Sequence, residues 1–189
     1  MAKNQKRGAD RPTSTQGRLD GSGSGSRLAT YAVGGIVSLV LVAFAAAAFA
    51  SSNQPGEEVE SLGNEHIASV NAPHEPYNTD PPTSGPHVDS LAPWGVSEEP
   101  IPDELQVHNL EDGGVAIQYG SGVQEGDVET LASIVRDYDR VILAPRPNLP
   151  EKKIALTAWG RILELEDLDE EQIRDFIEAY EGIDHHGAG

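Results

Sequence analysis

The chain has 189 residues, enough for one domain and an additional segment such as a membrane anchor. Its 31 acidic residues outnumber 13 basic ones, and the formal net charge of −18 argues against nucleic acid as a partner. It has no cysteine and a single methionine at residue 1, which excludes disulfides, thiolate nucleophiles and sulfur-ligated metal sites.

Charge is distributed unevenly along the chain. Residues 1–27 carry six bases and two acids, whereas the remainder carries seven bases and 29 acids. This asymmetry predicts that the two ends face different surroundings. The run Gly21–Ser26 alternates Gly and Ser, a composition typical of flexible linkers. Residues 1–27 are therefore predicted to be a disordered basic tail in the cytoplasm.

Residues 28–50 form an uncharged apolar run of 23 residues. At about 1.5 Å per residue, a helix of this length crosses a hydrocarbon layer of roughly 30 Å. Because bases precede the run and acids follow it, the positive-inside rule predicts a single-pass protein of the cell membrane. The lipid bilayer is thus an expected partner, and the acidic C-terminal domain is expected to be extracytoplasmic.

A cleaved signal peptide is the alternative, since Ala48-Phe49-Ala50 resembles a cleavage site. The 27-residue polar lead is long for a signal peptide, and the apolar run exceeds the usual length of about 7–15 residues. An uncleaved signal-anchor is therefore favoured.

Nine prolines between residues 51 and 104 rule out long helices and central strands. The stretch nevertheless contains His66, His74, His87 and Trp94. Structureless runs of this length inside a domain are uncommon and are usually functional or disordered. Aromatic and His residues beside rigid prolines favour a loop that packs on the domain, and Trp94 is expected to attach it to the sheet.

Regular periodicity begins at residue 105. Residues 105–110 alternate as a short strand does, and Gly113-Gly114 and residues 115–119 would complete a hairpin. Apolar residues at helical spacing then predict a helix over 128–135, with Asp127 as its N-cap.

The remaining predicted elements are two strands and a helix. Residues 140–144 are predicted to form a buried strand, and residues 153–159 another that continues through Gly160 into 161–165, with Trp159 in the core. The last helix is expected to begin after Asp169, which forms a capping box with Gln172, and to end at Gly182. Its predicted apolar face comprises Ile173, Phe176, Ile177 and Tyr180.

The element order ββαββα predicts an α+β domain: a small mixed sheet of about four strands, with two helices on one face. The predicted organisation places a linker at 51–60, the domain at 61–183 and a flexible tail at 184–189. The transmembrane helix and the Pro-rich loop precede the regular part of this domain.

The candidate chemistry lies in His66, His87, His108 and Asp112. Four of the six His fall in the Pro-rich stretch or at the first predicted strand, and none lies between Asp112 and Asp184. A His-based site needs three or four such side chains to converge. Without sulfur ligands, and outside the cytoplasm, imidazole and carboxylate favour Cu or Zn. The sequence thus predicts a divalent-metal module.

Two other interpretations use the same residues. The His and acidic residues could form a structural polar network and turn, with the Pro-rich loop binding a neighbouring protein of the cell envelope. Alternatively, Ser84 could be a nucleophile, with His87 or His108 as its base and Asp112 as the orienting acid. Ser84 is not in a G-x-S-x-G motif, and no P-loop, dinucleotide fingerprint or His-Glu-x-x-His is present, so no reaction is assigned.

Three motifs occur in order along the chain: Pro-Pro-Thr-Ser-Gly-Pro-His at 81–87, His-Asn-Leu-Glu-x-Gly-Gly-Val at 108–115 and Ala-Leu-Thr-Ala-Trp-Gly-Arg at 155–161. In these motifs the chain resembles the domain of unknown function 3105 family over about residues 60–182. The resemblance implies an N-terminal membrane anchor and no established activity. It also implies that family members usually have His at the position of Asp112, so that here a carboxylate would replace an imidazole.

Overall fold

The computed structural model describes residues 54–187, which form an α+β domain with a mixed six-stranded sheet and three helices. The predicted cytoplasmic tail (1–27) and transmembrane segment (28–50) lie outside the described residues, as does the start of the predicted linker. Within residues 54–187, no helix has the length and apolar character needed to cross a membrane.

The larger sheet has the strand order β1-β8-β7-β5-β6-β4. Its strands are β1 (Glu57–Glu58), β4 (Gly95–Val96), β5 (Val115–Tyr119), β6 (Val141–Pro145), β7 (Ile154–Ala158) and β8 (Arg161–Leu165). β4, β5 and β6 are parallel, whereas β5, β7, β8 and β1 pair antiparallel in turn. A separate two-stranded parallel sheet joins β2 (His66–Ile67) to β3 (His87–Val88).

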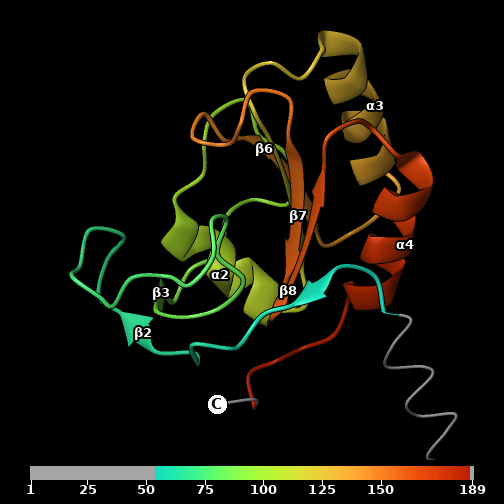
Figure 1. Ribbon diagram of the computed structural model, residues 1–189. Coiled ribbons are helices and arrows are strands. Elements are labelled where there is room, and N and C mark those ends of the chain that lie inside the picture. The colour runs from blue at the N-terminus through green and yellow to red at the C-terminus, as the bar shows by residue number, and fades with distance from the viewer. Residues whose placement is uncertain (1–53, 188–189) are drawn as a thin grey trace, which may run out of the picture. The chain divides into compact units, whose positions relative to one another are not determined.

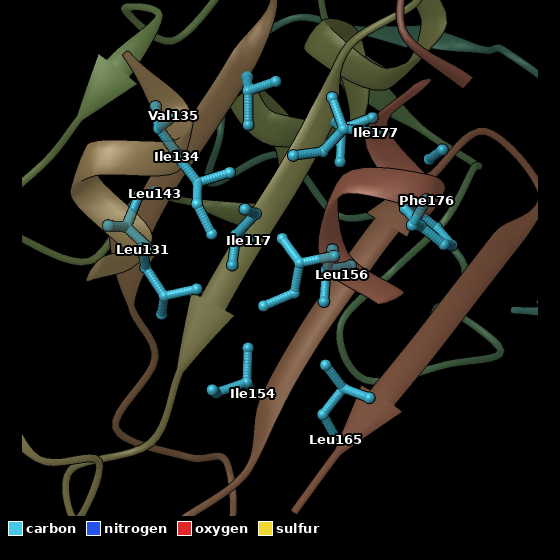
Figure 2. Close-up of a cluster of buried hydrophobic side chains, with 14 of the residues drawn as sticks. Ile117, Leu131, Ile134, Val135, Leu143, Ile154, Leu156, Leu165, Phe176 and Ile177 are labelled. Carbon is cyan, nitrogen blue, oxygen red and sulfur yellow. The ribbon is translucent and has the colours of Figure 1, made fainter. Parts of the chain in front are cut away.

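One face of the larger sheet is covered by α3 (Glu125–Val135) and α4 (Glu170–Tyr180) (Figure 1). α3 connects the parallel strands β5 and β6, as a crossover helix does. Apolar side chains of the helices and strands pack between them, among them Ile117, Leu156 and Phe176 (Figure 2). This apolar layer is the main hydrophobic core of the domain.

The opposite face carries α2 (Asp103–Glu111) and the Pro-rich segment that precedes it (Figure 1). Val107 and Leu110 of α2 pack against Ala116 and Trp159, and Trp94 packs against a second small apolar cluster on β6. At the end of β6, Arg146 pairs with Asp80 of the Pro-rich segment and Asp103 of α2. The segment is therefore attached to both the helix and the sheet.

The α+β class is confirmed, whereas the predicted ββαββα order and the count of four strands are wrong. The structure has six strands in the main sheet, a third helix, and helical layers on both faces. The strand predicted across 153–165 turns at Gly160, whose φ is +66°, and so forms the β7–β8 hairpin. The capping of α4 is as predicted: Asp169 accepts a hydrogen bond from the Gln172 backbone N–H.

The largest error is at residues 105–110, where the predicted strand is part of α2. Their alternation of apolar and polar side chains resembles a half-exposed strand, but residues 106–111 are all buried. The polar members do not face water. Asn109, for example, accepts from the Ala92 backbone N–H and donates to its carbonyl oxygen. A helix buried on both its apolar and polar sides lacks the amphipathic period that identifies surface helices.

Candidate metal centre

His66 and His87 are brought together by the small parallel sheet. They are direct register partners in the β2–β3 pair, although they are 21 positions apart in the chain. Backbone hydrogen bonds hold the pairing: Gly85 N–H donates to Gly63 O and His87 N–H to Glu65 O, each at 2.9 Å. Their imidazole rings meet edge to face, with centroids 4.7 Å apart.

α2 contributes His108 and Glu111 to the same place. An i,i+3 spacing puts two side chains on one side of a helix, and here that side faces the β2–β3 pair. The amide of Asn109 fixes the helix against the chain at Ala92, through hydrogen bonds of 2.8 and 3.0 Å. The helix and the small sheet therefore position three imidazoles and one carboxylate from three separate chain segments.

The carboxylate of Glu111 lies at the centre of this cluster and is fully buried. Its Oε2 atom lies 2.9 Å from His87 Nε2, 3.7 Å from His66 Nε2 and 3.9 Å from His108 Nδ1. One ligand atom from each of the four residues lies within 4.8 Å of the other three. In a tetrahedral zinc site with bonds of about 2.0–2.1 Å, neighbouring ligand atoms lie roughly 3.4 Å apart. The observed distances from Oε2 fall on both sides of that value.

The hydrogen bonds of His87 require a proton or a metal cation between it and Glu111. His87 Nδ1 lies 2.8 Å from the Gly85 carbonyl oxygen, which can only accept, so Nδ1 carries a hydrogen. In the neutral ring Nε2 then has only a lone pair, yet it points at a carboxylate oxygen 2.9 Å away. Two acceptors at this distance need a proton or a metal cation between them.

The outer contacts of the cluster resemble those of metal sites. Ligating imidazoles usually donate their second N–H to a carbonyl or carboxylate, and ligating carboxylates are themselves hydrogen-bonded. His87 makes the first kind of contact with Gly85, and Asn64 Nδ2 makes the second by donating to Glu111 Oε1 at 2.9 Å. These bonds leave His87 Nε2 and Glu111 Oε2, which lie 2.9 Å apart inside the cluster, as the atoms that a metal could bind.

His108 has a nitrogen that finds no hydrogen bond in the described residues. Its Nδ1 is buried and unpartnered, although a buried polar atom normally has a partner. Burial, followed by the neighbouring His87, lowers the pKa of His108, while Asp112 and Glu111 raise it to a lesser extent. The lowered pKa favours the neutral imidazole, which is the form that binds metals.

A second group lies beside the first, at the end of α2. One ligand atom each from His108, Asp112 and His186 lie within 4.8 Å of one another. His186 comes from the C-terminal segment, in which Gly182 N–H donates to Gly113 O and His185 N–H to Glu111 O. Gly113, at φ +80°, permits this approach, because a Cβ there would lie 2.7 Å from the Ile183 nitrogen. The stretch predicted to be a flexible tail thus contacts α2.

The structure unites three of the four predicted ligands. His66, His87 and His108 converge, but the carboxylate at their centre is Glu111, and Asp112 belongs to the adjacent group. The His108–Glu111 spacing would have indicated a shared helical face had residues 105–110 been predicted as helix. No sequence signal places His186 here, since its position depends on where the chain runs after α4. His74 lies outside both groups, with Nε2 3.3 Å from Glu104 Oε1.

The residues proposed for a serine hydrolase are not arranged as a triad. The Ser84 hydroxyl is buried and accepts a hydrogen bond from Leu62 N–H at 2.9 Å. Both ring nitrogens of His87 are engaged with Gly85 and Glu111. Within residues 54–187, no hydrogen bond joins Ser84 to a histidine. Ser84 instead connects the Pro-rich segment to the residues before β2.

Comparison with known proteins gives one match. The model of a protein family described as "Protein of unknown function (DUF3105)" matches residues 71–188. This span contains five of the six ligand residues of the two groups and lacks only His66. No curated protein and no solved structure matches the chain.

Proposed function

The chain belongs to the DUF3105 family of proteins of unknown function, and we propose that its domain binds a divalent transition metal through His66, His87, His108 and Glu111. The observation that carries the proposal is the convergence of three imidazole nitrogens, from separate segments, on one buried carboxylate oxygen at 2.9–3.9 Å. Three nitrogens and one oxygen form a common ligand set for tetrahedral zinc and also suit Cu²⁺.

The cost of the cluster without a metal supports the proposal. Without a metal, a proton between His87 Nε2 and Glu111 Oε2 would give either a neutral imidazole and carboxyl group or a buried imidazolium–carboxylate pair, whose two side chains are 0% and 1% exposed. Removing such charges from water costs several kcal/mol per ion, which their attraction recovers only with good geometry. It would also leave His108 Nδ1 without a partner. A cation at the centre gives every ligand atom in the cluster a bond.

The exposure of the ligands supports a site that can exchange metal with its surroundings. His66 is the accessible ligand, with 44% of its side chain exposed, whereas His87 and Glu111 are buried. A metal ion would therefore enter past His66. The placement of the domain outside the cytoplasm, behind an anchor at 28–50, remains part of this proposal. It is supported by the basic residues before that segment and the acidic residues after it.

Metal analysis of the full chain, purified without a polyhistidine tag, tests the proposal. After loading with Zn²⁺ or Cu²⁺ and exhaustive dialysis, the wild-type chain is expected to retain the metal stoichiometrically. The His87→Ala, His108→Ala double variant is expected to lose it. His74→Ala is the matched control, because His74 lies on the same side of the sheet but outside both ligand groups. A wild-type chain that retains no metal from either salt would overturn the proposal.

If the double variant keeps its metal, the four-residue site is likewise wrong. If wild type binds none and the double variant mainly loses stability, the histidines form a structural network instead.

A further inference from the structure

We infer that the domain holds a second divalent cation next to the first, bound by His186 and Asp112 with His108 or the shared Oε2 of Glu111 as the third donor. This inference rests on the proposed function for its first cation. It assigns a role to the C-terminal segment, which the four-residue site does not use.

The six ligand side chains do not all converge on one point. His66, His87, His108 and Glu111 form one group, and His108, Asp112 and His186 form another, with only His108 in common. Across a single metal with bonds of about 2.1 Å, no two ligand atoms can be more than roughly 4.2 Å apart. Within each group the ligand atoms lie within 4.8 Å of one another, but the six residues together do not meet this condition. The arrangement therefore describes two adjacent positions.

The orientation of the His186 ring also indicates a second cation position. Its Nδ1 lies 2.8 Å from Asp184 Oδ1, so this nitrogen donates to the carboxylate and Nε2 is left as the ligand atom. Nε2 lies 3.3 Å from Asp112 Oδ1 and 3.8 Å from Glu111 Oε2. As at His87, the neutral ring would present a lone pair to a carboxylate oxygen, so a proton or a cation is needed between Nε2 and Asp112 Oδ1.

The Glu111 carboxylate lies between the two groups. Its Oε2 is within 3.9 Å of a nitrogen from each of four histidines: His66, His87, His108 and His186. A carboxylate in this position can bridge two cations. In two-metal sites the ions are about 3.5–4 Å apart, which is the spacing that a shared oxygen imposes. Arg140 Nη1 donates to the Asp112 carbonyl oxygen rather than to its carboxylate.

The C-terminal segment is held firmly enough to present His186. His185 N–H donates to Glu111 O at 2.8 Å, and the His185 ring stacks on Trp159, with centroids 6.0 Å apart and planes inclined by 18°. Figure 1 shows this coil leaving α4 and ending near α2. His185 therefore anchors the segment, and His186, 48% exposed, is its metal-binding residue.

Zinc titration of the full, untagged chain, followed by metal analysis after gel filtration, tests the inference. Wild type is expected to bind two Zn²⁺ per chain, and His186→Ala and Asp112→Ala one each. His74→Ala, which removes a histidine that belongs to neither group, is the matched control and is expected to retain two. Loading with Cu²⁺ gives a second measurement: electron paramagnetic resonance should show a coupled pair in wild type and an isolated Cu²⁺ signal in His186→Ala.

The outcomes separate the two proposals. One Zn²⁺ in both wild type and His186→Ala overturns the second site and leaves the first intact. Two Zn²⁺ in His186→Ala also overturns it, because His186 would then be no ligand. Loss of all zinc in His186→Ala would make His186 a ligand of the first cation and again contradict two positions. No zinc in wild type overturns both proposals. Because His186 is half-exposed, its substitution should leave the urea unfolding midpoint of the metal-free chain unchanged.

Discussion

The two faces of the main sheet have opposite character. Toward α3 and α4 the buried layer is almost wholly apolar, whereas toward α2 the buried residues include His87, His108, Asn109 and Glu111. Apolar packing stabilises a fold in proportion to buried area and tolerates many shapes. Buried polar groups destabilise it unless each one finds a partner in the right place. The difference indicates that the first face supplies much of the stability, whereas the second carries the proposed metal site.

The largest effect is expected from the apolar face. Phe176→Ala removes a fully buried ring from α4 and should lower the free energy of unfolding by about 3–5 kcal/mol. Because Phe176 lies across the sheet from α2, the folded variant should bind as much metal as wild type. Urea unfolding and metal analysis of the same preparation measure both quantities.

Val96→Ala is the matched control for this substitution. Val96 is a half-exposed apolar residue on the edge strand β4, and its loss should cost less than about 0.5 kcal/mol. A Phe176→Ala variant that unfolds like wild type would show that the apolar layer contributes little stability, and a folded variant that binds no metal would show that the two faces are coupled.

Any increase in the free energy of unfolding on adding metal should depend on the ligands of the α2 face alone. A cation that binds only the folded chain, at 100 times its dissociation constant, raises the free energy of unfolding by about 2.7 kcal/mol. Wild type should show this gain on adding Zn²⁺, and Glu111→Gln should not, because it removes the charged central ligand. Thermal melts with and without the metal provide the measurement.

Glu104→Gln serves as the control, since Glu104 contacts His74 outside both groups. It should respond to Zn²⁺ as wild type does. An equal response from Glu111→Gln would place the bound metal elsewhere on this acidic domain.

A smaller effect is expected from the hydrogen bond that orients Glu111. Asn64→Ala removes the donor to Oε1 while leaving all proposed ligands in place. Loss of such an outer contact typically weakens metal affinity 10–100-fold. Competition against a chromophoric chelator would measure the change. Asn78→Ala, which removes an exposed hydrogen bond to Glu60 O in the same Pro-rich segment, should leave the affinity unaltered.

The sequence predicted the apolar face far better than the polar one. The helix α4, its Asp169 cap and its apolar face were read correctly, because a local pattern and the final environment agree there. Strands β5 and β6 were also located by their apolar composition, whereas β7 and β8 were predicted as one continuous strand. Each of these segments buries its apolar side chains, so periodicity reports directly on structure.

On the polar face, hydrophobic periodicity predicts the wrong element at residues 105–110, for a physical reason. Periodicity assumes that polar residues face water, but in α2 they face the histidines of another segment. His66, His87 and His108 were nonetheless predicted as a group, from residue type alone. Glu111 and His186 were missed because their positions depend on the identity of α2 as a helix and on the path of the chain after Gly182. Such long-range contacts leave no local pattern.

The smallest effect concerns the exposed end of the apolar face, at the Asp169 cap of α4. Hydrogen bonds from the Gln172 side chain and backbone lower the pKa of Asp169 below its ordinary value. A lowered folded-state pKa means that the carboxylate stabilises the fold at pH values above its unfolded pKa, near 3.9. That contribution is lost as the pH falls through the folded-state pKa. Asp169→Asn keeps a side-chain oxygen for the cap but removes the charge.

The variant should therefore be slightly less stable than wild type at pH 7, and the difference should vanish under acidic conditions. Urea midpoints of the metal-free chains at pH 7 and at pH 2–3 test this sign, and a difference that persists or grows in acid would contradict it. Asp169→Ala, which loses the oxygen as well, should stay less stable than Asp169→Asn at both pH values. Such a result would assign this part of the pH response to the charge of Asp169, because the amide of Asp169→Asn keeps the capping oxygen.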